Sequence, residues 1–247
     1  MHFKKIDQFG NLEMSYISDF SGGYISRNKH ILENLELNPI NQFILEKSVY
    51  GTPIFKLGNG GKKVLVLSGI HGNELSPQIA NLNLINELLE KELNNTVYFI
   101  PFAAPKSSMN NERSFNSRDL NRSANIKNSI SNLIIQAIEN LGISAVGDFH
   151  STSYNSNPGC ESVFSSKSPT AESFLIANYI SSDVGSEMIS YDFASSSMYT
   201  GAIEDTCNLK GIPSVTCEVL SPFGIVGRGA VDVSFSQMKS FLSYFGI

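Results

Sequence analysis

The feature that most constrains the fold of this chain is an alternation of short apolar runs with longer amphipathic segments. The apolar run KVLVLS (residues 63–68) precedes the segment LSPQIANLNLINELLEKEL, in which Ile79, Leu82 and Ile85 recur at helical spacing. A second apolar run, TVYFIPF, follows after Asn94 and Asn95. A strand, a helix and a second strand in this order make a βαβ unit, whose two strands run parallel.

The same alternation continues to the end of the chain. It predicts helices over residues 126–141 and 171–180, another through Asp205, and a last one over residues 231–245. The runs ISAVGDF and SVTCEV and residues 188–191 are predicted strands. The predicted fold class is therefore α/β, a single domain with a mixed, mostly parallel central sheet and helices on both faces.

Residues 43–68 contain two β-rich stretches, FILEK with TPIFKL and then KVLVLS, separated by the glycine turn of residues 58–61. They predict an antiparallel pair that leads into a central strand. Residues 107–131 and 151–168, rich in Asn and Ser, are predicted to be two long loops, which in a compact domain often carry function.

Length and charge limit the organisation and the classes of partner. The 247 residues are expected to form one catalytic domain over residues 1–247, with residues 1–42 packed on it as an extension and no further β domain at the C-terminus. A net charge of -5 argues against binding of nucleic acid, which depends on Lys and Arg. No signal peptide or membrane-spanning run is evident, so a cytoplasmic protein without membrane contact is expected, with Cys160, Cys207 and Cys217 as reduced thiols.

Polar residues that can bind a metal follow two of the predicted strands. His71 and Glu74 lie in SGIHGNE, at the end of KVLVLS. His150 lies in VGDFHSTS, where it follows an apolar run and comes two residues after Asp148. Ligands bind beyond the carboxyl ends of parallel strands, and two imidazoles, a carboxylate and water make a catalytic zinc site. Either histidine motif taken alone is more often a surface turn or a structural histidine. Together they predict one Zn²⁺ bound by His71, Glu74 and His150.

A third predicted strand carries Glu218 within the apolar run SVTCEV. A carboxylate is costly to bury unless it is paired or chemically used. An ion-paired structural glutamate is one interpretation. The other is a general base that takes a proton from water beside the zinc.

The segment NERSFNSRDLNR concentrates basic side chains in a chain with only 18 Lys and Arg. Arg113, Arg118 and Arg122 can grip carboxylates in bidentate fashion, and Asn121 adds an amide. A solvated charged loop is the alternative interpretation. Beside a zinc site, recognition of a substrate carboxylate is favoured.

These motifs together resemble the zinc carboxypeptidase superfamily, and within it the succinylglutamate desuccinylase and aspartoacylase branch. GIHGNE (residues 69–74) is similar to the first zinc motif of that branch, RSFNSRDLNR (residues 113–122) to its substrate-binding motif and GDFHST (residues 147–152) to its third-ligand motif. TCEV, which contains Glu218, takes the place of the catalytic glutamate. The resemblance covers roughly residues 43–219.

The resemblance implies roles for individual residues. The zinc ligands would be His71, Glu74 and His150. Glu218 would activate water, and Arg113 would polarise the scissile carbonyl. The substrate-binding residues would be Asn121 and Arg122 for a carboxylate, Arg118 as a secondary candidate, and Tyr199 before GAIED as a counterpart of the substrate-contacting tyrosine of the family.

The predicted function is a zinc-dependent hydrolase of an amide bond next to a free carboxylate, of the N-acyl amino acid deacylase type, acting on a small molecule or a short peptide. A metallocarboxypeptidase is the alternative, and a non-catalytic zinc-binding scaffold or sensor is an alternative of another class. The chain departs from the family in three ways: 29 residues follow Glu218, no Arg lies between Tyr199 and Glu218, and AAPKSS replaces an Asn-Pro pair. A phosphate-binding loop is excluded because Gly58, Gly60 and Gly61 precede a strand and no GK[ST] follows.

Overall fold

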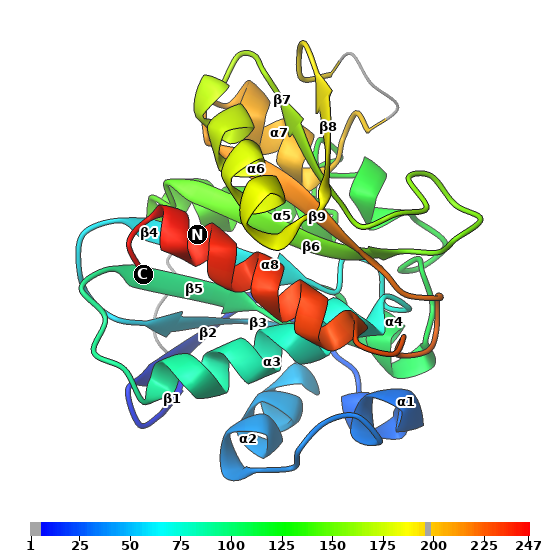
Figure 1. The fold of residues 1–247 in the computed structure, drawn as a ribbon. Helices are drawn as coiled ribbons and strands as arrows, with labels where there is room; N and C mark the ends of the chain where they lie inside the picture. Colours follow the sequence, from blue (N-terminus) through cyan, green and yellow to red (C-terminus); the bar gives the residue numbers. More distant parts are fainter. Residues whose placement is uncertain (1–5, 196–198) are drawn as a thin grey trace.

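The computed structural model describes residues 6–195 and 199–247, which form a nine-stranded sheet flanked by helices (Figure 1). The strand order is β1-β2-β3-β5-β4-β6-β9-β7-β8. The strands are β1 (Asp7–Phe9), β2 (Leu12–Ser18), β3 (Thr52–Leu57), β4 (Lys63–Ser68), β5 (Thr96–Ile100), β6 (Ala145–Thr152), β7 (Ser162–Ser166), β8 (Glu187–Tyr191) and β9 (Ser214–Leu220). The helices are α1 (Lys29–Leu32), α2 (Pro39–Ser48), α3 (Leu75–Leu89), α4 (Pro105–Asn110), α5 (Ile130–Leu141), α6 (Ala171–Val184), α7 (Ile203–Leu209) and α8 (Ala230–Tyr244), with 3₁₀ turns η1 (Ile25–Arg27) and η2 (Leu120–Arg122).

Parallel pairing joins β5, β4, β6 and β9 in the middle of the sheet, and β8 pairs parallel to β7. The pairs β1-β2, β2-β3, β3-β5 and β7-β9 are antiparallel. The predicted fold class, a single α/β domain with a mixed sheet, is confirmed. The carboxyl ends of β4, β6 and β9 lie at one edge, where such sheets bind ligands.

Helices cover both faces of the sheet because the central strands are apolar on both sides (Figure 1). In β4, Val64 and Val66 pack into a core with side chains of α3, α6 and α8, whereas Leu65 and Leu67 pack into a second core with α5 and α7. Successive side chains of a strand point to opposite faces, so one strand contributes to both cores. No helix in residues 6–195 or 199–247 has both the length and the apolarity to cross a bilayer.

The stretch FILEK, predicted to be a strand, lies in α2, so that prediction is wrong. The cause is local: the side chain of Asn38 accepts a hydrogen bond of 2.9 Å from the backbone N–H of Asn41, and Pro39 occupies the first helical turn. An Asn cap followed by Pro starts a helix, and this outweighs the β preference of Phe43 and Ile44.

The predicted antiparallel pair of TPIFKL and KVLVLS is also wrong. β3 pairs antiparallel with β2 and β5, and β5 separates it from β4. Residues 6–42 thus contribute β1 and β2 to the sheet itself. The two predicted loops contain regular structure as well, because residues 162–166 form β7, and residues 107–131 include part of α4 and the turn η2.

Candidate metal centre

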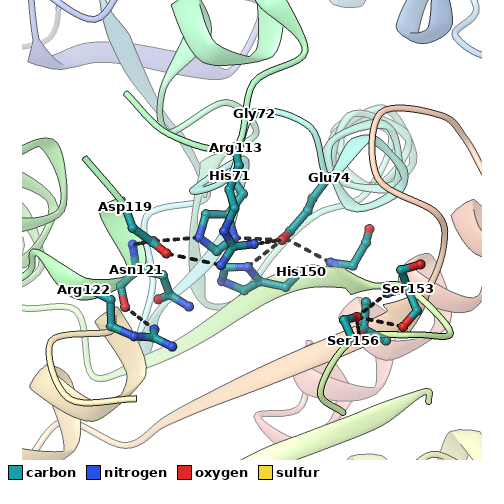
Figure 2. Close-up of polar contacts among 12 residues, drawn as sticks. His71, Gly72, Glu74, Arg113, Asp119, Asn121, Arg122, His150, Ser153 and Ser156 are labelled. Carbon is teal, nitrogen blue, oxygen red and sulfur yellow. Dashed lines mark hydrogen bonds and ion pairs between the residues drawn. The ribbon is translucent and has the colours of Figure 1, made fainter. Parts of the chain in front are cut away.

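Three buried side chains that can ligate a metal converge at the carboxyl ends of β4 and β6. His71 follows β4, Glu74 directly precedes α3, and His150 lies near the end of β6 (Figure 2). One ligand atom from each lies within 4.8 Å of the others, and the three side chains are 2%, 4% and 1% exposed. The structure thus brings together residues 71, 74 and 150 as the sequence predicted.

The turn that carries His71 and Glu74 requires glycine at two positions. Gly69 has φ +73, a left-handed conformation that side chains rarely adopt. A Cβ on Gly72 would lie 2.2 Å from the carbonyl carbon of Ser107 at α4, so any larger residue would push the turn away. The side-chain amide of Gln78 in α3 donates to the carbonyl of Glu74 at 2.8 Å and so holds the turn in place.

Glu74 holds the two histidines in one orientation. It occupies the N-cap position of α3, yet its side chain makes no capping bond. Its Oε1 lies 2.7 Å from Nδ1 of His71, and its Oε2 lies 2.8 Å from Nδ1 of His150 and accepts from the backbone N–H of Ser151 at 3.1 Å. Both imidazoles therefore direct Nδ1 toward the same point.

Two further carboxylates hold the opposite sides of the imidazole rings. Nε2 of His71 lies 2.9 Å from Oδ1 of Asp119, and Nε2 of His150 lies 3.1 Å from Oδ2 of Asp148, a side chain with no exposed surface. Partners of this kind fix the tautomer and ring orientation of metal-ligating histidines. The ring nitrogens that face the centre are left available as electron-pair donors.

The local electrostatics suit a cation. Burial would raise the pKa of Glu74, but the neighbouring His71 and His150 outweigh it and hold that pKa well below its ordinary value. Burial would lower the pKa of His150, but Asp148 and Glu74 outweigh it and hold that pKa well above its ordinary value. Two imidazoles and a carboxylate, with anionic groups behind them, are the donor set that zinc takes in catalytic sites. The residues present fit a zinc ion.

Arg113 lies next to His71 and Glu74 (Figure 2). Its Nη1 donates to Oε1 of Glu74 and its Nη2 to Oδ2 of Asp119, both at 3.3 Å. The side chain is 45% exposed, so the guanidinium can reach a molecule that enters from solvent.

Glu218 lies beside the centre on β9, directly opposite His150 on β6. Burial raises its pKa to about 8, and the charges of Glu74 and Asp148 add to this effect. Within the described part of the chain, Oε2 of Glu218 has no hydrogen-bond partner. A carboxylate with a pKa near neutrality is suited to take up and release a proton.

A cavity of about 300 Å³ connects these groups with residues from the 113–122 segment. Arg113, Asn121, Arg122, Tyr199 and Glu218 all line it. Cζ of Arg122 lies 5.5 Å from the centre of the Tyr199 ring, a cation–π contact that positions the guanidinium.

Arg118, the remaining predicted substrate residue, does not line this cavity. It is exposed and pairs through its backbone with Phe115 in a separate surface hollow. The structure therefore brings every predicted site residue except Arg118 to one place.

The catalytic-domain profile of the succinylglutamate desuccinylase/aspartoacylase family matches residues 60–219. This chain belongs to that family. The resemblance inferred from the four motifs is confirmed, and the matched range contains the three candidate ligands and Glu218.

Solved structures of an aspartoacylase family protein, a succinylglutamate desuccinylase/aspartoacylase and a metallo-carboxypeptidase share the fold. An aspartoacylase family protein from Mesorhizobium loti matches with a TM-score of 0.61 and 20% identity, over 79% of this chain and 62% of that one. A succinylglutamate desuccinylase/aspartoacylase from Rhodobacter sphaeroides matches with a TM-score of 0.58 and 17% identity, over 81% and 61% of the two chains. A metallo-carboxypeptidase from Burkholderia cenocepacia matches with a TM-score of 0.60 and 14% identity, over 79% and 61%.

This family member therefore spans about three fifths of the length of those three proteins. Comparison with curated proteins gives no match.

No sequence motif predicted a role for two carboxylates of the site. Asp119 lies inside RSFNSRDLNR, two residues before Asn121, and Asp148 lies two residues before His150. Side chains alternate between the two faces of a strand, so residues 148 and 150 share one face. This spacing is a sequence signal for Asp148. No local pattern predicts that Asp119 reaches His71 across 48 residues.

We expect Asp148→Asn to weaken zinc binding about 10–100-fold, the range typical of losing an outer partner of a ligating histidine. The substitution keeps the shape of the side chain but removes the charge 3.1 Å from Nε2 of His150. Competition for zinc against a chromophoric chelator measures the change. Asp192→Asn, which alters a carboxylate that is 93% exposed, should leave the affinity unchanged.

A second buried carboxylate, Glu204, predicts a pH dependence of stability. Burial raises its pKa from 4.5 to about 8. The folded protein therefore holds this proton more tightly than the unfolded chain, so the stabilisation is complete below pH 4.5 and is lost as the pH rises toward 8. We expect Glu204→Gln to flatten the slope of unfolding free energy against pH in this window by up to about 1.4 kcal/mol per pH unit. Urea unfolding from pH 5 to 8 tests this, and parallel curves for the two proteins would contradict it.

Proposed function

We propose that this chain is a zinc-dependent hydrolase that cleaves an amide bond next to a free carboxylate, as an N-acyl amino acid deacylase. One observation carries the proposal. Three buried candidate ligands, an acid whose pKa is about 8 and two guanidinium groups line or border one cavity. Membership of the succinylglutamate desuccinylase/aspartoacylase family supports it.

His71, Glu74 and His150 would hold the metal. When bound, zinc supplies a Lewis acid that polarises a carbonyl and lowers the pKa of water. Asp119 and Asp148 keep the rings of the two histidines aligned, from 2.9 and 3.1 Å. These two carboxylates would position the site without touching substrate.

Glu218 would move the proton. Its Oε2 takes a proton from the attacking water and delivers it to the nitrogen of the leaving amine, which then departs as a neutral amine. Arg113, half exposed at the same cavity, places positive charge where the carbonyl oxygen becomes negative. A preformed charge of this kind lowers the barrier because it needs no reorganisation during the reaction.

Asn121 and Arg122 would hold the free carboxylate of the substrate. Arg122 is held against the Tyr199 ring and donates from Nη1 to the carbonyl of Asn121 at 2.5 Å (Figure 2). Oδ1 of Asn121 has no partner from the described residues, which leaves the amide free to turn toward a ligand. Pairing of guanidinium with carboxylate is geometrically specific, so it would fix which amide bond reaches Glu218.

Elemental analysis of the purified protein combined with hydrolysis assays tests the proposal. We expect about one zinc per chain, and cleavage of N-acyl amino acids that a chelator abolishes and added zinc restores. Preferential cleavage of peptides at the C-terminal bond would make the chain a carboxypeptidase instead. A zinc-loaded protein inert toward both substrate sets would support the scaffold or sensor interpretation.

A further inference from the structure

Two aromatic rings form part of the wall of the candidate cavity, and the proposed mechanism does not use their surface to bind substrate. Phe164 of β7 and Tyr199 both line the cavity, together with Arg122 and Glu218. The centres of the two rings lie 5.2 Å apart and their planes are inclined at 67°, a T-shaped contact that stabilises the pair. This pair of rings is the aromatic wall of the cavity.

The aromatic wall begins at the candidate carboxylate anchor. Cζ of Arg122 lies 5.5 Å from the centre of the Tyr199 ring. The backbone joins the same two segments, because the N–H of Ala124 donates to the carbonyl of Gly201 at 2.9 Å. The N–H of Ala202 donates to the carbonyl of Tyr199 at 2.9 Å and closes the turn before α7. A carboxylate bound by Arg122 therefore lies close to the Tyr199 ring.

The aromatic wall ends beside Glu218. Phe164 lies directly opposite Thr216 of β9, so Glu218 is its diagonal neighbour on the same face, about 7–8 Å away. Burial raises the pKa of Tyr199, the charge of Glu218 raises it further, and the charge of Arg122 lowers it. Tyr199 is thus close enough to both groups to sense their charges. The wall runs from the carboxylate anchor to the group expected to move the proton.

An N-acyl amino acid bound as proposed must lie along this wall. Its carboxylate and its amide nitrogen are both bonded to Cα, which also carries the side chain. With the carboxylate on Arg122 and the nitrogen at Glu218, Cα lies between these two groups. The side chain therefore starts within reach of the rings of Phe164 and Tyr199.

The polar group next to the aromatic wall is neutral. Glu204, which also lines the cavity, accepts hydrogen bonds from the hydroxyl of Tyr191 and from the amide of Asn208. Burial raises the pKa of Glu204 to about 8, so it keeps its proton at neutral pH. The Tyr191 ring that it holds lies 6.4 Å from the Tyr199 ring. This side of the cavity therefore offers apolar surface and no charge to a ligand.

The basic groups of the cavity are already engaged. Among the described residues that line it, the basic side chains are those of His71, Arg113 and Arg122. His71 is a candidate metal ligand, and Arg113 donates to Glu74 and Asp119 at 3.3 Å. With Arg122 on the first carboxylate, an acidic side chain would lose its hydration without gaining an unengaged cation. An apolar side chain gains free energy by burial against the rings.

We propose that the aromatic wall of Phe164 and Tyr199 is the subsite for the amino acid side chain, so that the substrate is an N-acyl derivative of an amino acid with a large apolar side chain. The proposal rests on the function proposed above, which supplies the carboxylate anchor and the position of the amide. Arg122 would hold the carboxylate, and the two rings would hold the apolar side chain.

Calorimetric binding of free amino acids to the zinc-loaded protein tests the subsite without requiring turnover. Phenylalanine and alanine differ only in the aromatic ring, and glutamate and lysine supply the two charges. We expect phenylalanine to bind at least about tenfold more tightly than alanine, as burial of a large apolar side chain provides. Both charged amino acids should bind more weakly than phenylalanine.

Phe164→Thr tests the wall itself. Threonine is a good strand former, so the pairing of β7 is expected to persist. The preference for phenylalanine over alanine should fall at least about threefold, while the affinity for alanine stays constant and shows that the anchor is intact. Phe9→Thr is the matched control, since it removes a partly buried ring from β1, at the other end of the sheet. It should leave the preference unchanged.

Equal affinity for phenylalanine and alanine in the unaltered protein, or tighter binding of glutamate or lysine than of phenylalanine, would overturn the subsite whatever the variants do. A preference that persists in full in Phe164→Thr would also overturn it. A preference that depends on Phe164 supports the subsite even if the protein hydrolyses no amide. A higher kcat/KM for N-acyl glutamate than for N-acyl phenylalanine would leave the hydrolase intact and remove the subsite.

Discussion

Glu218→Gln should reduce amide hydrolysis by about 10²–10⁴-fold, the range that general acid–base catalysis contributes. The side chain keeps its size, but it can no longer take a proton from water. Because Glu218 is not among the three candidate ligands, the zinc content should not change. Steady-state kinetics with the best N-acyl amino acid, run beside elemental analysis, measures both quantities.

Glu46→Gln is the matched control, since it makes the same chemical change on the exposed face of α2. Its kcat/KM should equal that of the unaltered protein. Undiminished hydrolysis by Glu218→Gln would remove this residue from the mechanism. A fall in zinc content would show instead that Glu218 acts on the metal site, and the kinetic loss would then say nothing about proton transfer.

His71→Ala should lose the zinc. The substitution removes one of three candidate ligands and leaves Glu74 with a single imidazole partner. We expect the zinc affinity to fall by more than the about 10–100-fold that outer partners contribute, and hydrolysis to fall with it. Dialysis against metal-free buffer followed by elemental analysis measures the loss.

His30→Ala provides the comparison, because His30 lies far along the chain in α1, with its imidazole near Glu33. It should retain zinc and activity. Full zinc occupancy in His71→Ala would exclude His71 as a ligand. Glu74 and His150 would then remain as the candidate ligands.

The central features of the fold could be predicted from the sequence because they depend on local patterns. The apolar runs of β4, β5, β6 and β9 have no competing signal, and the motifs follow two of them directly. The strands β1, β2 and β7 were not predicted. β7 is the short, Ser-rich segment SVFSS, whose pairing with β9 depends on distant residues and not on its own composition.

The order of the strands in the sheet also could not be predicted from the sequence. A glycine turn between two β-rich runs is typical of a hairpin, but β5 enters between β3 and β4 and pairs with both. The same non-local cause applies in the site. His71 and Glu74 were predictable as neighbours in one turn, whereas Asp119 and Glu204 reach the site from segments with no metal-binding pattern of their own.

The antiparallel placement of β7 beside β9 separates two tasks within one cavity. The candidate metal ligands and Glu218 come from the ends of β4, β6 and β9, while Phe164 of β7 and Glu204 of α7 form another wall. Mutations in that wall can therefore accumulate without disturbing the reacting atoms. Among duplicated descendants of an ancestral gene, selection could retune the accepted amino acid through a few positions in β7 and α7 while the reaction itself is inherited unchanged.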